Sequence, residues 1–326
     1  MSERHVIVTG GAGFIGSHLV ERLLADGRKV VVIDDLSTGS LENLSIVRND
    51  PRLTILQSKV SECRQLIEFV AKADFIFHLA AAVGVELVLQ SQVQTIHTNL
   101  HETEVLFAAA SVLRVPVLLA STSEVYGKSQ KDFFSEEDDL IIGPPHLSRW
   151  SYACSKLMDE FLALAYWREK QLPVVIARLF NTVGPRQTGK YGMVLPRFIA
   201  AAKRGEPLKV FGDGTQTRCF CYVKDTVEAL VRLSKAPAAF GEIFNIGSAE
   251  EISIRSLAET VIRATRSHSS IEFIPYSQAY PPGFQDMLRR KPSTEKLKRV
   301  TGFSPATPLA EIIQATSGEL QQGIRI

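Results

Sequence analysis

The sequence predicts an α/β fold built around one doubly wound parallel sheet. In the first half of the chain, short β-branched runs alternate with longer amphipathic stretches, the pattern of βαβ units with right-handed crossovers. The short runs are apolar almost throughout, as expected of parallel strands that helices cover on both faces. We therefore expect ligands to bind at the carboxyl ends of these strands.

Six apolar runs are the expected strands of the sheet. In chain order they are His5–Thr9, Lys29–Asp34, Leu53–Leu56, Asp74–Leu79, Val117–Ser121 and Pro173–Leu179. The amphipathic stretches between them predict the helices Gly16–Asp26, Val93–Leu113 and Ser151–Lys170. In the first of these, Leu19, Leu23 and Leu24 share one face, and Gly27 offers a C-cap.

After residue 181 the pattern changes to short strands and helices separated by turns rich in Pro and Gly. The expected strands are Leu208–Phe211, Ile243–Ile246 and Ile271–Pro275, and the expected helices are Met193–Gly205, Lys224–Ser234 and Ile254–Arg266. Thr307 followed by Pro308 predicts the start of a last helix. The sequence thus predicts a sheet domain over residues 1–180 and a smaller α/β lobe over residues 181–326 that interleaves with the sheet.

Composition restricts the partners of the chain. Lys and Arg number 37 against 35 Asp and Glu, a net charge of +2, which gives no reason to expect a nucleic acid or an anionic membrane. No apolar run approaches the roughly eighteen residues that span a bilayer. The four cysteines are scattered, as in reduced cytosolic proteins, and Cys219 and Cys221 lack further ligands at metal-binding spacing. We expect a cytoplasmic protein without a metal site.

A glycine-rich turn joins the first expected strand to the first expected helix. It reads Gly10-Gly11-Ala12-Gly13-Phe14-Ile15-Gly16, and glycines at the first, fourth and seventh positions allow a tight turn and close approach of the backbone to a pyrophosphate. Asp34 ends the second strand, where a carboxylate accepts both adenosine ribose hydroxyls and repels a 2′-phosphate. The sequence therefore predicts a Rossmann-type NAD site. A solvated acidic turn at Asp34-Asp35 is the alternative.

Tyr152 and Lys156 have the spacing that places two side chains on one helix face. An ammonium beside the phenol, together with the positive nicotinamide ring, favours the tyrosinate and lets Tyr152 serve as a base. The segment Ser121–Gly127 lies upstream, at the end of the fifth expected strand. The catalytic residues are therefore expected at the same edge of the sheet as the cofactor.

These motifs resemble those of the extended short-chain dehydrogenase/reductases, a superfamily of nucleotide-sugar epimerases, 4,6-dehydratases and decarboxylases. The resemblance covers nearly the whole chain. Its motifs are Gly10–Gly16, His78-Leu79-Ala80-Ala81, Thr122-Ser123-Glu124, Tyr152–Lys156, Arg178–Arg186 and Gly212–Arg218.

The resemblance implies roles for individual residues. Tyr152 would be the base, Lys156 would hold the ribose and tune Tyr152, and Thr122 would bind the reacting sugar hydroxyl. The implied NAD site further comprises Gly10, Gly13, Phe14, Ile15, Gly16, Asp34, Asp35, Val60, Leu79, Ala80, Ala81, Asn99 and Phe180.

The resemblance also implies a nucleotide-sugar site. Asn181 and Arg218 would contact the diphosphate, and Phe211 would line the nucleobase pocket. The complete set is Thr122, Ser123, Tyr152, Asn181, Arg186, Phe211, Gln216, Arg218 and Arg290. A surface ion pair is the alternative for Arg218.

Glu124 separates the reactions of this superfamily. The resemblance implies that simple 4-epimerases carry a small or hydroxyl residue at this position, whereas 4,6-dehydratases and UDP-glucuronate decarboxylases carry a glutamate. Ser123 precedes Glu124, as in the decarboxylases, whereas an acidic residue commonly precedes it in dehydratases. A carboxylate that caps the turn at Gly127 is the alternative.

Two further stretches, Arg149–Lys156 and Gly283–Ser293, resemble the decarboxylase of bacterial aminoarabinose synthesis and the plant UDP-apiose/UDP-xylose synthases. The resemblance implies that Arg290 serves decarboxylation, because a cation beside C5 holds a carboxylate and then assists protonation. Binding of the diphosphate, as in epimerases, is the alternative for Arg290.

The expected reaction starts when Tyr152 takes the proton of the sugar C4 hydroxyl while hydride passes to NAD, so that a 4-ketone makes neighbouring bonds labile. Decarboxylation of UDP-glucuronate is the predicted outcome. A 4-epimerase of UDP-glucose or UDP-glucuronate stays open, since the loop Ala82–Glu86 resembles epimerases. A 4,6-dehydratase and an NAD-sensing regulator without turnover are further alternatives. By analogy with the family, we expect a homodimer joined through the helices Val93–Leu113 and Ser151–Lys170.

Overall fold

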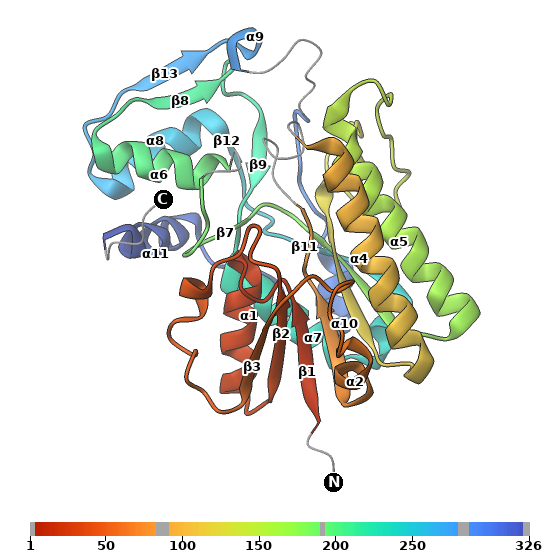
Figure 1. Cartoon of the computed structure of the whole chain (residues 1–326). Coiled ribbons are helices and arrows are strands. Elements are labelled where there is room, and N and C mark those ends of the chain that lie inside the picture. Colours follow the sequence, from red (N-terminus) through yellow and green to blue (C-terminus); the bar gives the residue numbers. More distant parts are fainter. Residues whose placement is uncertain (1–3, 83–90, 190–192, 280–286, 322–326) are drawn as a thin grey trace.

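The β-branched runs of the first half form strands that pair in parallel (Figure 1). The computed structural model describes residues 4–82, 91–189, 193–279 and 287–321. The loop 83–86 and residues 283–286, on which two of the resemblances rest, lie outside the described residues.

The central sheet has seven strands in the order β11-β6-β5-β4-β1-β2-β3. All six neighbouring pairs are parallel. The strands are β1 His5–Thr9, β2 Val30–Asp34, β3 Leu53–Gln57, β4 Ala73–His78, β5 Val117–Thr122, β6 Val174–Leu179 and β11 Glu242–Ile246. The chain reverses its direction of winding between β1 and β4, and such a switch point opens a crevice at the carboxyl ends of the strands. The predicted doubly wound sheet is confirmed.

Helices cover both faces of this sheet (Figure 1). Val6 and Val8 of β1 pack with the apolar residues of α1 (Phe14–Ala25) and α7 (Val223–Ser234). Ile7, between them, points to the other face and packs with α4 (Gln92–Leu113) and α5 (Ser151–Lys170), because successive strand residues alternate in direction. The short helices α2 (Leu66–Ala71) and α10 (Glu295–Thr301), which the sequence did not predict, complete the two layers.

The two edge strands differ from the rest. All five residues of β1 and of β2 are buried, whereas no residue of β3 is fully buried. The reason is that β3 has a neighbour on one side only. At the other edge β11 comes from the second half of the chain and pairs with β6, Ile243 facing Ile176. The domain division at residue 181 stays a prediction, since β11 and α7 belong to the sheet body.

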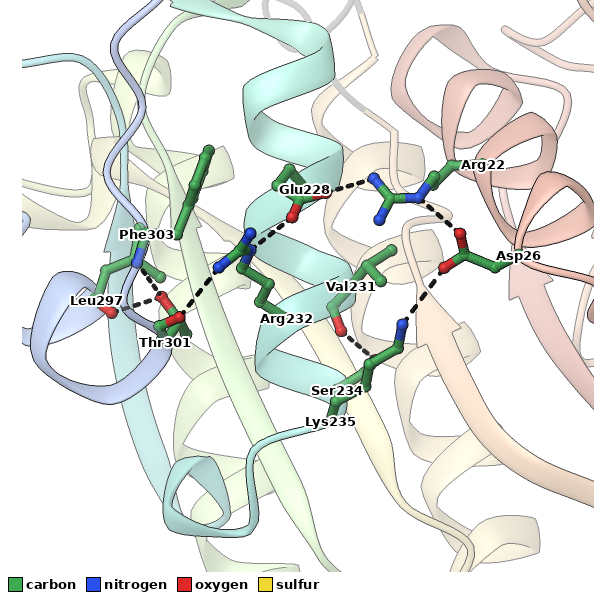
Figure 2. A network of polar contacts seen from close by, with 10 residues as sticks. All are labelled: Arg22, Asp26, Glu228, Val231, Arg232, Ser234, Lys235, Leu297, Thr301 and Phe303. Carbon is green, nitrogen blue, oxygen red and sulfur yellow. Dashed lines mark hydrogen bonds and ion pairs between the residues drawn. The ribbon is translucent and has the colours of Figure 1, made fainter.

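A polar network ties α1 to α7 and α10 on the outer side of the sheet (Figure 2). Arg22 of α1 binds Asp26 at 3.0 Å and also pairs with Glu228 of α7. Glu228 in turn accepts from Arg232, whose guanidinium donates to the carbonyl of Thr301 at 3.3 Å. These side chains are partly exposed, so each pair contributes about 1 kcal/mol or less. The network therefore sets the register of the helices more than it stabilises them.

The second lobe lies beside the carboxyl ends of the strands (Figure 1). Its strands pair two by two: β8 Leu208–Phe211 with β13 Ile271–Ile274, β9 Thr217–Cys219 with β12 Glu251–Ser253, and β7 Thr182–Val183 with β10 Cys221–Tyr222. The helices α6 Val194–Arg204, α8 Ile254–Thr265 and α11 Leu309–Gln321 enclose a core of their own with β8. The remaining elements are α9 Tyr276–Ala279 and the 3-10 turns η1 Leu41–Leu44, η2 Ser123–Tyr126, η3 Ser148–Trp150 and η4 Pro237–Ala239. Within the described part of the chain, no helix has the length and apolar character that a membrane span requires.

Candidate active site

A cavity of about 1410 Å³ opens where the carboxyl ends of the sheet strands meet the second lobe. A pocket for one drug-sized ligand measures about 300–1,000 Å³, so this cavity has room for a dinucleotide and a second ligand. Most residues predicted to bind the cofactor line it. They are Gly10, Gly13, Phe14, Ile15, Gly16, Asp34, Asp35, Val60, Leu79, Ala80, Ala81 and Tyr152.

The glycine-rich turn forms a cradle that side chains would fill. Gly10 has φ +68°, and a Cβ there would lie 2.8 Å from the amide nitrogen of Ala80. A Cβ on Gly16 would lie 2.0 Å from the carbonyl oxygen of Gly10. Gly13 caps α1 without a side-chain hydrogen bond, so the amides of the first helical turn face an incoming anion. The turn therefore fits a pyrophosphate.

Asp34 is held in place by the backbone. Its Oδ2 accepts from the amide of Ala12 and its Oδ1 from the amide of Leu36, both at 2.8 Å. Burial raises the pKa of Asp34, and these two amides oppose the rise. The side chain is buried rather than solvated, which overturns the interpretation of Asp34 as part of an exposed acidic turn. An ionised carboxylate still offers lone pairs to ribose hydroxyls, so the NAD preference keeps its structural basis.

Three residues predicted to touch the cofactor lie behind the cavity wall instead of in it. The Asn99 side chain accepts from the amide of Ala82 at 2.8 Å and donates to Ser155 at 3.0 Å, which joins α4 to α5. Phe180 is fully buried beside Tyr126. Lys156 is 2% exposed. The physical reason is that each is satisfied by packing or by a polar partner inside the protein, so their predicted contacts stay unsupported in this arrangement.

The charge around Tyr152 differs from the expectation. Thr122 hydrogen-bonds the Tyr152 phenol, whereas Lys156 Nζ donates to Asp159 Oδ2 at 2.8 Å. Burial raises the pKa of Tyr152, the charges of Glu124 and Asp159 raise it further, and the bond to Thr122 opposes the rise. The prediction that Lys156 lowers this pKa is therefore wrong for the protein by itself, because Asp159 neutralises the ammonium.

Glu124 lies between two arginines. Arg290 Nη1 donates to Glu124 Oε1 at 2.7 Å, and Arg149 Nη1 pairs with Glu124 Oε2. Burial alone would raise the pKa of Glu124, but Arg149 and Arg290 outweigh it and lower the pKa to about 2. The turn at Gly127 is closed by the main-chain carbonyl of Glu124, which accepts the Gly127 amide at 3.0 Å. The alternative that the carboxylate caps this turn is therefore wrong.

The remaining substrate residues divide into two groups. Those that line the cavity are Thr122, Ser123, Asn181, Phe211, Gln216, Arg218 and Arg290. Arg218 is 7% exposed, so the alternative of a surface ion pair is wrong. Arg186 does not line the cavity; its guanidinium donates to Ser17 at 3.2 Å and to Glu21 at 2.6 Å on α1. The correction for Arg186 follows from its φ of +67°, which turns the chain toward α1.

Arg149 is the charged residue that the sequence analysis left without a role. It lies in η3, directly before α5, and lines the cavity beside Tyr152. Its position three residues before Tyr152, which is one helical turn, is a signal that was present in the sequence. That spacing did not predict a contact with Glu124, because the two residues belong to different segments that only the fold brings together.

Comparison with known proteins agrees with this geometry. The model of the NAD dependent epimerase/dehydratase family matches residues 6–247. The chain belongs to this family. The resemblance to the extended short-chain dehydrogenase/reductases, the fold class and the NAD cofactor are thereby confirmed.

Members of the family with known names are similar over nearly the whole chain. The UDP-N-acetyl-alpha-D-glucosaminuronate decarboxylase of Bacillus cytotoxicus is 42% identical over 93% of both chains. UDP-glucuronic acid decarboxylase 6 of Arabidopsis thaliana is 36% identical over 95% of this chain and 87% of its own. Among solved structures, the UDP-glucuronic acid 4-epimerase of Bacillus cereus, in complex with UDP-glucuronic acid and NAD, superposes with a TM-score of 0.88 at 28% identity, covering 98% of this chain and 99% of that one.

Proposed function

We propose that this family member is an NAD-dependent decarboxylase of a UDP-linked uronic acid and acts through a 4-keto intermediate. The observation that carries the proposal is the position of Glu124 between Arg149 and Arg290, beside the Tyr152 phenol. UDP-glucuronate is the predicted substrate. Its 2-acetamido counterpart is the second candidate, because the 42% identical relative is named for that sugar.

The charge balance of this cluster favours an acidic sugar. Two buried guanidiniums face one buried carboxylate, which leaves one positive charge in excess in the cavity wall. Buried charges are stable when they are paired. A carboxylate on C5 of the sugar supplies the missing negative charge, whereas a neutral sugar supplies none.

The side chains can carry out the steps in sequence. Tyr152 takes the proton of the C4 hydroxyl, which Thr122 aligns, and bound NAD supplies the acceptor and later the donor of the C4 hydride. The resulting ketone lies β to the carboxylate, so the bond from C5 to the carboxylate carbon breaks, carbon dioxide leaves, and the electron pair passes to the C4 oxygen. C5 then takes a proton from water, and Arg290 stabilises the negative charge that develops there.

A 4-epimerase is the second candidate function. It is favoured by the Bacillus cereus structure, whose substrate is the same uronate. Epimerisation uses Tyr152 and Thr122 in the same way but keeps the carboxylate on the sugar. The presence of Glu124 beside two arginines favours decarboxylation, because an enzyme that only turns over the ketone needs no charged cluster at C5.

We also propose that the enzyme is a cytoplasmic homodimer. The outer face of α4 and α5 exposes large apolar side chains, namely Val93, Ile96, Val112, Met158 and Phe161. Contiguous apolar patches of this kind mark protein interfaces. Pairing of two copies through these helices would bury the patch in a four-helix arrangement.

The test is to incubate the purified protein with NAD and, in separate reactions, with UDP-glucuronate and UDP-N-acetylglucosaminuronate. Released carbon dioxide and the masses of the UDP-sugars are then measured. We expect a product lighter by carbon dioxide from one of the two. A product of unchanged mass that co-elutes with UDP-galacturonate would replace the proposal with 4-epimerisation. Neutral UDP-glucose serves as the control, for which we expect no loss of mass.

A further inference from the structure

We propose that the two arginines on Glu124 have different tasks in the proposed decarboxylation, on which this inference rests. Arg149 is a positioning residue that stays bound to Glu124 throughout the reaction. Arg290 is the arginine that leaves Glu124 and binds the carboxylate of the sugar.

Arg149 is fixed by its surroundings. It lies in η3, immediately before α5, the helix that carries Tyr152. Its guanidinium lies 5.5 Å from the centre of the Trp150 ring, and Trp150 is itself packed so closely on Gly143 that a Cβ there would lie 2.0 Å from the indole nitrogen. The side chain of Arg149 is 8% exposed. An arginine held in this way keeps its partner in one position relative to Tyr152.

Arg290 faces the cavity from the opposite side. It belongs to an irregular segment of the second lobe rather than to a helix, and its second terminal nitrogen donates to Asn181 Oδ1 at 3.1 Å. Asn181 and Arg290 both line the cavity. Since Asn181 is neutral, Arg290 can exchange the Glu124 carboxylate for a substrate carboxylate without leaving an anion unpaired on its other side.

The exchange conserves charge pairing only if the other arginine remains. When Arg290 turns to the substrate, Glu124 keeps Arg149, and each of the two carboxylates then has its own guanidinium. If Arg149 also left, Glu124 would be a buried carboxylate without a cation, which is strongly unfavourable. When carbon dioxide departs, Arg290 loses its anion and returns to Glu124. The two arginines therefore form one fixed and one mobile contact around the same carboxylate.

The division of tasks has two separate consequences. Arg290 should determine the preference for an acidic sugar over a neutral one. Arg149 should leave that preference unchanged but keep Glu124 ionised, so its loss should raise the pKa of Glu124 and move the acid limb of the kcat profile to higher pH. The sign follows because one of the two cations that favour the carboxylate form has been removed.

The experiment compares Arg149→Met, Arg149→Lys and Arg290→Met with the wild type in protein loaded with NAD. Equilibrium binding of UDP-glucuronate and of UDP-glucose is measured by calorimetry, and carbon dioxide release is measured from pH 4 to pH 9. We expect Arg290→Met to lose the preference for UDP-glucuronate by about tenfold or more. Arg149→Met should keep that preference while its acid limb rises by about one pH unit or more, and Arg149→Lys should restore much of the shift.

The inference is overturned if Arg149→Met loses the preference for the acidic sugar and Arg290→Met keeps it, or if the acid limb of Arg149→Met coincides with that of the wild type. Thermal unfolding of each variant, with its NAD content, shows that the fold is intact. Should Arg149→Met be unfolded, the milder Arg149→Lys still predicts a smaller shift in the same direction, and an unshifted profile contradicts the inference. A wild type that releases no carbon dioxide from either uronate refutes the proposed function, whereas the binding preference still tests which arginine holds the carboxylate.

Discussion

Tyr152 lies near two carboxylates, Glu124 and Asp159, and after burial both raise the pKa of its phenol. A Tyr-x-x-x-Lys spacing is thus compatible with a tyrosine that is fully protonated in the protein by itself. The positive charge that the nicotinamide ring brings is the contribution still missing from this balance. At the scale of single residues, the reactivity of Tyr152 is therefore a property of the charges around it and not of the motif.

Substitution of Tyr152 by Phe tests the base directly. We expect turnover to fall by about a thousandfold or more, because the proton of the C4 hydroxyl loses its acceptor. Binding of NAD should change little, since the phenol oxygen is the only group removed. Turnover is followed by product mass, and NAD content by denaturing extraction. Wild-type turnover in this variant would remove Tyr152 as the base.

Glu124 should make stability depend on pH. Its folded pKa of about 2 lies below its ordinary value of 4.5, so the carboxylate stabilises the native state above pH 4.5, and this contribution is lost as the pH falls through about 2. In Glu124→Gln the contribution is absent at every pH. The difference in unfolding free energy between the two proteins, measured by urea titration, should therefore shrink between pH 5 and pH 2. A constant difference would contradict the ionised state of Glu124.

Glu124→Ala separates the two halves of the reaction. Oxidation at C4 should survive, seen as absorbance of the reduced cofactor, because Tyr152 and Thr122 remain. Release of carbon dioxide should stop, since the cluster at C5 is broken. Two buried arginines lose their partner in this variant, so we also expect a stability loss of about 3–5 kcal/mol. Loss of the absorbance in a folded variant would mean that Glu124 has a role in the first step.

At the scale of elements, the start of α1 is specified twice. The glycines between β1 and α1 are required by close backbone contacts, and the same contacts leave the first amides of α1 open to a pyrophosphate. The sequence motif therefore predicts both the turn and its ligand. By contrast, the short strands β7, β9, β10 and β12 have two or three residues each, too few for a pattern of alternation.

Gly16→Ala tests the cradle. Its Cβ would lie 2.0 Å from the Gly10 carbonyl oxygen, so the turn must shift, and we expect a loss of about 1–3 kcal/mol in stability together with weaker NAD binding. Gly318→Ala is the matched control, because nothing lies within 4 Å of a Cβ at that position in α11. Unfolding free energy and NAD affinity are the measurements. Equal effects of the two substitutions would show that close packing at Gly16 is not the cause.

At the scale of the whole molecule, the active site exists only where the sheet body and the second lobe meet. Tyr152 and Glu124 come from the sheet side, and Arg290 comes from the second lobe, 166 residues beyond Glu124. The strand β11 crosses in the other direction and completes the sheet. The two parts of the chain therefore depend on each other for both the fold and the site.

The proposed homodimer belongs to this scale. Phe161, which is 63% exposed on α5, lies on the apolar face that would pair with a second copy. Phe161→Glu places a charge in that interface, so we expect the dimer to dissociate into monomers. Light scattering coupled to size exclusion measures the mass. Ile46→Glu, at a 79% exposed position outside α4 and α5, is the control and should remain a dimer. A wild type that elutes as a monomer would refute the proposed assembly.

The sequence by itself determined what depends on local pattern. Apolar periodicity specified the strands and the long helices, and the bounds His5–Thr9 and Ser151–Lys170 agree with the structure at both ends. The glycine turn, Asp34 and the pair Tyr152 and Lys156 were identifiable because each motif is contiguous or spans one helical turn.

Only the tertiary structure decided how these groups are charged and which of them meet. It paired Lys156 with Asp159, turned Arg186 toward α1, and brought Arg149 and Arg290 to opposite oxygens of Glu124. The physical reason is that burial and Coulomb interactions depend on distances in space between segments far apart in the chain. Periodicity along the chain contains no information about those distances.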